Sequence, residues 1–265
     1  MQGFVVFLFS VIIKLMVKFN PQKFPPNLYK ERPKISEVIS VVAHQLRHPI
    51  SVIKSYLEAL ISEDFGKINS KQKEYLVDCL ENVKRMAKNV NDLLEVSLIE
   101  EGKYELKLQP LSLEEITESV VNNLALWAEA ANCEVIFQKP KAKLPKVLAD
   151  PLKIRQVLEN LISNAIKYKK AGRAKIEINL VKRGKEILFS CEDNGIGIAK
   201  EDFKKVFTKF YRSEEAMEID PSGAGLGLYL NKAIIELSGG KIWFSKNKDF
   251  GMTFYFTLPI IEEKT

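Results

Sequence analysis

Apolar residues recur every three or four positions in two segments of the chain, a spacing typical of helices that bury one face. The first segment contains Ile35, Ile39, Val42, Leu46, Ile53, Leu57 and Leu60. The second contains Leu76, Leu80, Val83, Ala87, Val90 and Leu94. DFGKINS (64–70) separates the segments, which predicts two long antiparallel helices. Because a lone pair buries these seams poorly, we expect a homodimer that forms a four-helix bundle.

From Lys103 onward, strand and helix patterns are mixed, which predicts an α+β domain. The segments that resemble strands are YELKLQPLSL (104–113), AKIEINLV (174–181), EILFSCED (186–193) and GMTFYFTLPI (251–260). The segments that resemble helices are LEEITESVVNNLALWAEAAN (113–132), DPLKIRQVLENLISNAIKY (150–168) and LGLYLNKAIIELSG (226–239). We expect an α/β sandwich with helices on one face of a sheet. The predicted domains are a helical hairpin at 35–102 and this sandwich at 103–265.

The start of the chain is apolar, but the run GFVVFLFSVII (3–13) ends at Lys14 and is short for a membrane span. We interpret residues 1–19 as a short membrane anchor, with Lys14 and Lys18 on the cytoplasmic side of the membrane. The alternative is a hydrophobic helix that packs on the protein itself. Residues 20–34 are rich in proline and basic residues, which predicts a linker.

The chain has a formal net charge of +6 and a pI near 9.0. Basic and acidic residues are interspersed, so we expect no nucleic-acid partner. The local excess of cations directly after the apolar start favours an anionic membrane surface instead. Three cysteines, Cys79, Cys133 and Cys191, lie far apart and lack the spacing of a metal or redox site. We expect all three to be buried thiols.

The only two histidines of the chain lie in VVAHQLRHPI (41–50), within the first predicted helix. His44 lies about 200° around the helix axis from the predicted apolar stripe, at about 100° per residue, so it should face solvent. His48 follows one turn later on the same face. Pro49 has no N–H for the carbonyl of Gln45, which predicts a kink. A zinc site of the H-E-x-x-H type is the alternative, but Gln45 replaces its glutamate base and no third histidine exists.

Two segments of the predicted sandwich carry groups suited to Mg²⁺ and phosphate. VLENLISNAIKY (157–168) places Asn160 and Asn164 one helical turn apart, and both side chains offer an amide oxygen. Mg²⁺ prefers oxygen ligands and bridges to phosphates while it keeps several waters. GAGLGL (223–228) opens a predicted helix, and a glycine-rich turn at a helix N-terminus binds phosphate.

A third segment, DNGIGI (193–198), follows a predicted strand and carries groups suited to adenine. The carboxylate of Asp193 accepts a hydrogen bond from the amino group of adenine, whereas guanine presents an acceptor at that position. This difference favours ATP over GTP. Gly195 and Gly197 allow the backbone to approach a flat base closely.

In this order and spacing, the three segments resemble the N box and the two glycine boxes of the GHKL ATPase superfamily. FTKFYRSEEAMEIDPS (207–222) is similar to the F box and mobile lid of that superfamily. VVAHQLRHPISVIKSYLEAL (41–60) resembles the H box of sensor histidine kinases of two-component systems. The resemblance covers residues 35–260. It implies an ATP-dependent protein-histidine kinase that uses ATP and Mg²⁺, phosphorylates His44 and passes the phosphoryl group to a response regulator.

The resemblance also assigns individual roles. The implied nucleotide-binding residues are Asn160, Asn164, Lys167, Tyr168, Asp193, Gly195, Gly197, Gly223, Gly225, Leu226 and Gly227. Asn164, with help from Asn160, is the implied Mg²⁺ ligand. Lys167 and Tyr168 match the lysine and tyrosine that lie near the phosphates and the base.

Two positions of the H box depart from the family pattern. Gln45 stands where an acidic residue usually takes or orients the imidazole proton, and an amide oxygen accepts that N–H but cannot act as a base. His48 stands where threonine or asparagine positions water for dephosphorylation of the regulator. One alternative is therefore a non-catalytic ATP-binding signalling module. Another is a GHKL ATPase that acts on DNA or client proteins, which the bundle with its exposed histidine does not favour.

Overall fold

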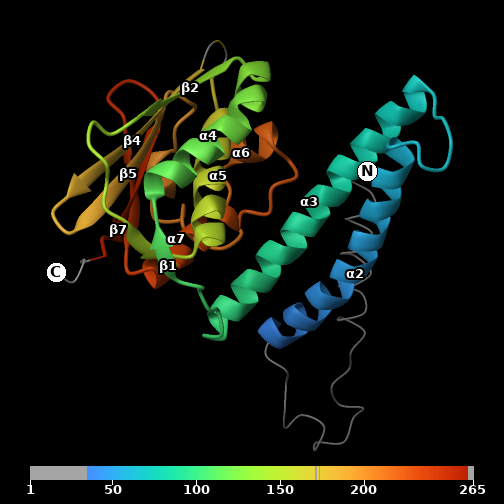
Figure 1. Ribbon diagram of the computed structural model, residues 1–265, viewed down its shortest axis with the longest axis horizontal. Helices are drawn as coiled ribbons and strands as arrows, with labels where there is room; N and C mark the ends of the chain where they lie inside the picture. The colour runs from blue at the N-terminus through green and yellow to red at the C-terminus, as the bar shows by residue number, and fades with distance from the viewer. Residues whose placement is uncertain (1–34, 171, 173, 262–265) are drawn as a thin grey trace, which may run out of the picture.

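The computed structural model describes residues 35–170, 172 and 174–261. Figure 1 shows a hairpin of two long helices beside an α/β domain, with α3 (Ser70–Glu100) between α2 (Ile35–Ile61) and that domain. The predicted anchor at 1–19 and linker at 20–34 lie outside the described residues. Within the described part of the chain, no helix is both long and apolar enough to cross a membrane.

The hairpin has helix ends that the sequence specifies locally. Asn69 begins α3 with a capping box: its Oδ1 accepts a hydrogen bond from the Gln72 backbone N–H at 2.8 Å, and Gln72 Oε1 accepts one from the Asn69 backbone N–H at 2.9 Å. The last turn ends at Glu101, and Gly102 follows with a φ of +66°. α2 continues through Pro49, and Figure 1 shows it changing direction along its course.

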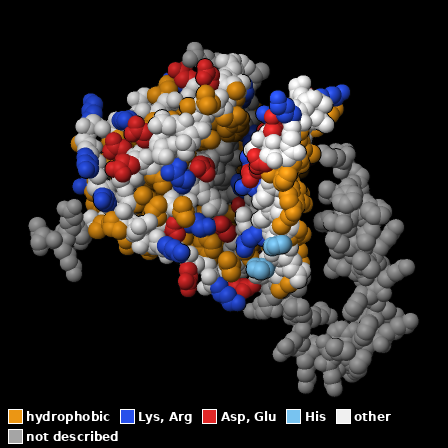
Figure 2. Space-filling view, turned by 45° about the vertical axis from the view of Figure 1, so that its right-hand side comes forward, with side chains coloured by type: hydrophobic (Ala, Val, Ile, Leu, Met, Phe, Trp, Pro, Cys, Tyr) orange, Lys and Arg blue, Asp and Glu red, His pale blue; other side chains and the backbone are white. Residues whose placement is uncertain are grey.

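A single hairpin covers the apolar stripe predicted for α2 only in part, since Ile39 and Leu57 are half-buried. Ala43 and Ile50 are buried, whereas Val42, Leu46 and Ile53 are 44–46% exposed. The apolar positions of α2 therefore form two faces, and a single hairpin covers only one of them. Figure 2 shows hydrophobic side chains along the hairpin, with the two histidine side chains at its surface near one end.

The α/β domain contains a five-stranded sheet of order β2-β4-β5-β7-β6, in which β2 and β4 pair in parallel and the other neighbours pair antiparallel. Its strands are β2 (Cys133–Gln138), β4 (Ala174–Arg183), β5 (Glu186–Asp193), β6 (Lys241–Lys246) and β7 (Met252–Pro259). A separate antiparallel pair is formed by β1 (Gln109–Leu111) and β3 (Val147–Ala149). The helical segments are α4 (Leu113–Ala130), α5 (Pro151–Lys167), η3 (Lys200–Asp202), α6 (Glu214–Ile219) and α7 (Gly227–Leu237).

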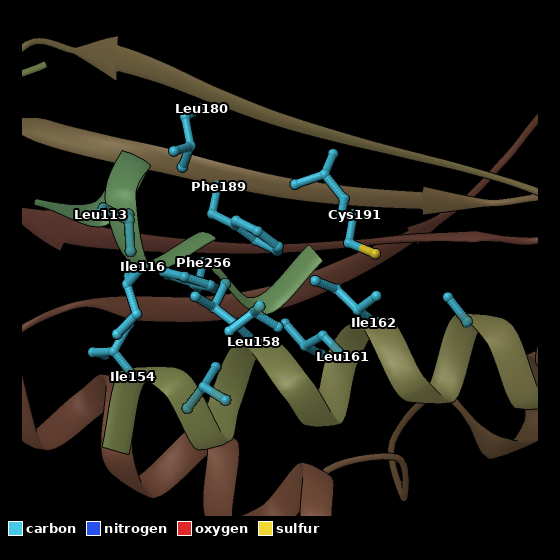
Figure 3. Packing of buried hydrophobic residues seen from close by; sticks show 14 of the residues in the cluster. Leu113, Ile116, Ile154, Leu158, Leu161, Ile162, Leu180, Phe189, Cys191 and Phe256 are labelled. Atoms are coloured by element: carbon cyan, nitrogen blue, oxygen red, sulfur yellow. The ribbon is translucent and has the colours of Figure 1, made fainter. Parts of the chain in front are cut away.

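The core lies between the sheet and the layer formed by α4, α5 and α7. Figure 3 shows Leu158 and Ile162 of α5 directed toward Phe189 and Phe256 of the sheet. The two phenylalanine rings are stacked, with centroids 4.6 Å apart. Along β4, buried residues alternate with more exposed ones, because only one face of the sheet is covered by helices. This packing fixes the ends of α5 and β5, where the candidate site lies.

The fold class predicted from the sequence is confirmed: a helical hairpin is followed by a sheet with helices on one face. The predicted strand at 104–113 is largely wrong, since only Gln109–Leu111 is a strand. The expectation for the cysteines is wrong at one position, because Cys79 is exposed on α3, whereas Cys133 and Cys191 are buried. Burial raises the pKa of the Cys191 thiol, which keeps it protonated.

Candidate functional site

A cavity of about 280 Å³ is enclosed by α5, the loop after β5, the segment before α7 and one side of α3. All of the predicted nucleotide-binding residues line this cavity except Gly195. Residues more than sixty positions apart in the sequence therefore meet in one place. The size of the cavity suits a small ligand with several polar groups.

Asp193, at the end of β5, is held by two backbone N–H groups. Its Oδ1 accepts hydrogen bonds from Gly195 at 2.8 Å and from Met252 at 3.2 Å. Both of these donors use Oδ1, so Oδ2 is available to a ligand in the cavity. Burial raises the pKa of the Asp193 carboxyl against the opposing effect of the two N–H donors.

Gly195 shapes the site without lining it. A Cβ at this position would lie 2.5 Å from the backbone oxygen of Tyr168, closer than any real contact. The same oxygen accepts a hydrogen bond from the Ile196 backbone N–H at 3.0 Å. The loop after β5 is therefore tied to the end of α5. Gly197 lines the cavity with a φ of +78°, which favours glycine.

Asn160 and Asn164 lie one turn apart on α5, and both face the cavity. The Nδ2 of Asn164 lies 3.4 Å from Oδ1 of Asn160, while the buried Nδ2 of Asn160 has no hydrogen-bond partner among the described residues. A Cβ at Gly227 would lie 2.6 Å from that Nδ2. Only glycine at 227 lets α7 begin this close to Asn160.

Lys167 and Tyr168 end α5 at the edge of the cavity. The Nζ of Lys167 forms an ion pair with Oδ2 of Asp220 at 2.8 Å. Asp220 follows α6 in the segment that resembles a lid. The lysine predicted to lie near phosphates is therefore paired with a carboxylate of the protein itself.

The glycine-rich segment before α7 packs closely on its surroundings. Gly225 has a φ of +69°, and a Cβ there would lie 2.8 Å from the carbonyl carbon of Phe210. Leu226 borders the cavity, but it is buried in a small apolar cluster with Leu230 and with Val96 of α3. Gly223 has its backbone oxygen bonded to Arg212 at 2.9 Å.

Sequence reasoning did not identify the α3 residues that line the cavity, which are Arg85, Lys88, Asn89 and Asp92. Their spacing of three and four positions places these polar residues on one face of α3. This spacing is the sequence feature that could have predicted a shared site. Asp92 is 5% exposed and forms an ion pair with Lys88 at 2.6 Å. Burial raises the pKa of Asp92 despite the nearby lysine.

His44, Gln45 and His48 are exposed on α2, as the sequence predicted for the two histidines. Arg47, between them, donates hydrogen bonds from Nε and Nη2 to Oδ1 of Asn91 on α3, both at 3.2 Å. No described residue of α2 lines the cavity. The histidine site and the cavity are therefore separate in this arrangement.

Two protein families match this chain. Residues 34–102 match the family described as His Kinase A (phospho-acceptor) domain, and residues 149–262 match the family described as Histidine kinase-, DNA gyrase B-, and HSP90-like ATPase. The sensor histidine kinase WalK of Bacillus subtilis is 34% identical over 229 residues, which cover 86% of this chain and 37% of that protein. The sensor protein RprX of Bacteroides fragilis is 30% identical, with 97% of this chain and 48% of that protein covered.

Solved structures share the fold. The Acinetobacter baumannii histidine kinase AdeS superposes with a TM-score of 0.57 at 27% identity, covering 83% of this chain and 98% of that chain. Full-length ShkA in complex with AMPPNP gives a TM-score of 0.69 at 24% identity, covering 87% of this chain and 47% of that one. The chain spans less than half the length of WalK and RprX.

The hairpin with its exposed histidine and the α/β domain with its cavity define a phospho-acceptor domain followed by an ATPase domain. The chain belongs to the HisKA-type histidine kinases that carry a GHKL ATPase domain.

Proposed function

We propose that this chain is an ATP-dependent protein-histidine kinase that phosphorylates His44 and passes the phosphoryl group to an aspartate of a response regulator. The observation that carries the proposal is the presence, in one chain and in this order, of an exposed His44 in a HisKA-matching hairpin and a cavity around Asp193 in an ATPase-matching domain. The relatives named as sensor histidine kinases support it. We propose a division of the chain near Gly102, into 35–102 and 103–265.

In this proposal ATP occupies the cavity with its adenine amino group on Oδ2 of Asp193. The phosphates lie against the glycine-rich segment 223–227, at the start of α7, where backbone N–H groups favour anions. Lys167 and Tyr168 lie at the same edge of the cavity, which supports their contact with phosphates and base.

The residues on α5 fit a Mg²⁺ ion that arrives with the nucleotide. The buried Nδ2 of Asn160 has no hydrogen-bond partner among the described residues, and a rotation of that amide exchanges its nitrogen and oxygen positions. Asn160 and Asn164 would then offer oxygen to the ion, which neutralises developing charge on the phosphates. Positioning of the two reactants supplies most of the remaining acceleration.

Transfer to His44 needs a change of domain arrangement or a second chain. The cavity is closed on one side by α3, and α2 lies on the far side of that helix (Figure 1). The exposed apolar face of α2, which includes Val42, Leu46 and Ile53, supports a homodimer in which a second hairpin covers it. A four-helix bundle of this kind would leave His44 accessible to an ATPase domain.

We also propose that residues 1–19 attach the protein to the cytoplasmic side of the cell membrane. The apolar run 3–13 and the basic residues that follow it support this attachment. Flotation with vesicles of anionic phospholipid is the measurement. Binding that survives removal of residues 1–34 would contradict the proposal.

The kinase proposal is tested by incorporation of ³²P from γ-labelled ATP with Mg²⁺. Wild-type protein should acquire label that is stable in base and lost in acid, as phosphohistidine is, and should then transfer it to a response regulator. His44→Ala should acquire none, while a His48→Ala control should still be labelled. Equal labelling of wild type and His44→Ala would contradict the assignment of His44.

A further inference from the structure

Asp220 lies in the cavity with both carboxylate oxygens engaged. Its Oδ2 forms the ion pair with Nζ of Lys167 at 2.8 Å. Its Oδ1 accepts hydrogen bonds from Oγ and backbone N–H of Ser222, at 2.6 and 3.1 Å. The side chains of Lys167 and Asp220 are 35% and 17% exposed, so the pair is partly shielded from water. A carboxylate held in this way offers the lysine a fixed, negatively charged oxygen, as a phosphate group does.

The backbone around Asp220 is also held in place. Arg212 donates hydrogen bonds to the backbone oxygens of Asp220, Ala216 and Gly223. The Oγ of Ser222, which donates to Asp220, accepts a hydrogen bond from Nη1 of Arg85 on α3 at 3.1 Å. A continuous set of contacts therefore connects α3 to Lys167 through Ser222 and Asp220.

Asp220 carries its negative charge at any physiological pH. Although burial favours the neutral acid, the Lys167 ammonium and the Ser222 hydrogen bonds outweigh it and lower the pKa of this carboxyl to about 2. An arriving triphosphate therefore meets a fixed anion beside the lysine it needs. Two anions next to one ammonium group repel each other, and one must leave.

We propose that Asp220 determines nucleotide affinity by occupying, as an internal carboxylate, the place of a phosphate group beside Lys167 until the triphosphate displaces it. The inference rests on the proposed function, because it requires that Lys167 contacts a phosphate. It goes further by assigning to the lid a residue that opposes binding. It also makes Ser222 the positioning residue through which α3 reaches the phosphate end of the cavity.

The test compares Asp220→Asn with the wild-type full chain by calorimetric titration with MgATP and with adenosine. Asparagine keeps the size and the contacts to Ser222 but cannot form the ion pair. We expect MgATP to bind about 3- to 5-fold more tightly to Asp220→Asn, which is the upper part of the range that the loss of one partly exposed ion pair allows. Adenosine, which has no phosphate, should bind both proteins equally. A general loss of structure would weaken binding rather than strengthen it.

The matched control is Glu218→Gln, which removes one negative charge from the exposed face of α6 outside the cavity. It should leave MgATP affinity within about two-fold of wild type, because exposed charges at a distance are screened by salt. An equal gain in both variants would mean a general charge effect of the lid and would overturn the proposal. Weaker MgATP binding to Asp220→Asn would also overturn it.

A double-mutant cycle tests the role of Ser222. Ser222→Ala alone should strengthen MgATP binding, by less than Asp220→Asn, since it loosens the carboxylate without removing it. In the Asp220→Asn background the same change should have no further effect. Additive effects would contradict the positioning role.

Two outcomes distinguish this inference from the proposed function. If wild type binds neither MgATP nor adenosine, the proposed function fails. If wild type binds MgATP and Asp220→Asn binds it equally well, only the role of Asp220 is contradicted.

Discussion

At the scale of single residues, the sequence indicated that Asp193 belongs to the candidate site but did not indicate the groups around it. The motif DNGIG predicts a carboxylate at the end of a strand, and Asp193 lines the cavity there. The donors that fix this carboxylate come partly from Met252, 59 positions away, and no local pattern shows that contact. Asp220 was missed for the same reason, because its partner Lys167 lies 53 positions earlier.

The substitution Asp193→Asn should weaken MgATP binding without lowering the stability of the fold near neutral pH. The backbone N–H groups of Gly195 and Met252 would hold the asparagine oxygen, which leaves its NH₂ group facing the adenine NH₂ group. Two donors then face each other, and MgATP affinity should fall by about 10- to 100-fold. Calorimetric titration measures this loss. Unchanged affinity would contradict the placement of adenine on Asp193.

The difference in stability between wild type and Asp193→Asn should depend on pH. Burial raises the folded-state pKa of Asp193 above its ordinary value of 3.8, so the folded protein holds this proton more tightly than the unfolded chain. The protonated carboxyl of Asp193 therefore stabilises the fold at low pH. This contribution is lost as the pH rises from 3.8 through the raised folded-state pKa, and above that pKa the charged carboxylate destabilises the fold. At pH 7 to 8, Asp193→Asn should unfold at a temperature no lower than wild type. A clear decrease at pH 7 that disappears at pH 4 would contradict this sign.

Gln45 offers a third prediction at the residue scale. An amide oxygen accepts a hydrogen bond from an imidazole N–H but cannot take its proton, whereas a carboxylate does both. Gln45→Glu should raise the initial rate of ³²P incorporation about ten-fold, and Gln45→Ala should lower it below wild type. Equal or lower rates for the glutamate variant would remove the idea that Gln45 limits transfer.

At the scale of elements, helices were easier to predict than short strands. The local sequence specifies the Asp150 N-cap of α5 and the apolar faces of α5 and α7, whereas β2 and β6 are six residues each and were missed. Part of the stripe predicted for α2 stays exposed in a single hairpin, where a second hairpin is expected to cover it. Both apolar faces of that helix have helical spacing, so the pattern alone does not show which one a single hairpin covers.

Gly227→Ala tests how closely α7 and α5 approach each other. The new Cβ would collide with the side chain of Asn160, so we expect a loss of about 1–3 kcal/mol in unfolding free energy and weaker MgATP binding. In the background of Asn160→Ala the collision disappears, and the same substitution should cost much less stability. Urea unfolding of the four proteins measures both effects. If Gly227→Ala loses as much stability in the Asn160→Ala background, the collision with Asn160 is not the cause of the loss.

At the scale of the whole molecule, the contact between the hairpin and the ATPase domain was not predictable from the sequence. It is built from single residues that belong to different elements. Val96 of α3 packs against Leu226 and Leu230, and Glu100 pairs with Lys209. Leu226 lies in the glycine-rich segment 223–228 and Lys209 in the segment 207–222, but neither segment indicates a contact with α3.

Glu95 is the polar centre of this contact. Its carboxylate accepts hydrogen bonds from Lys153 at 2.7 Å, Gln156 at 3.2 Å and Tyr104 at 3.1 Å, which join α3 to α5 and to the segment between the two domains. Since the cavity in this docked arrangement is walled by α3 and not by α2, a nucleotide in the cavity would lie away from His44 of the same chain.

Glu95→Ala should therefore release the ATPase domain and accelerate phosphorylation. We expect the initial rate of ³²P incorporation into His44 to rise about 2- to 10-fold, because three hydrogen bonds to a charged group at the contact are lost. The radius of gyration from small-angle X-ray scattering should increase at the same time. Glu74→Ala, on the exposed face of α3, is the matched control and should change neither quantity. If Glu95→Ala remains folded and compact yet is phosphorylated more slowly, the docked arrangement is the one that transfers the phosphoryl group, and His44 must then be reached in the partner chain of the dimer.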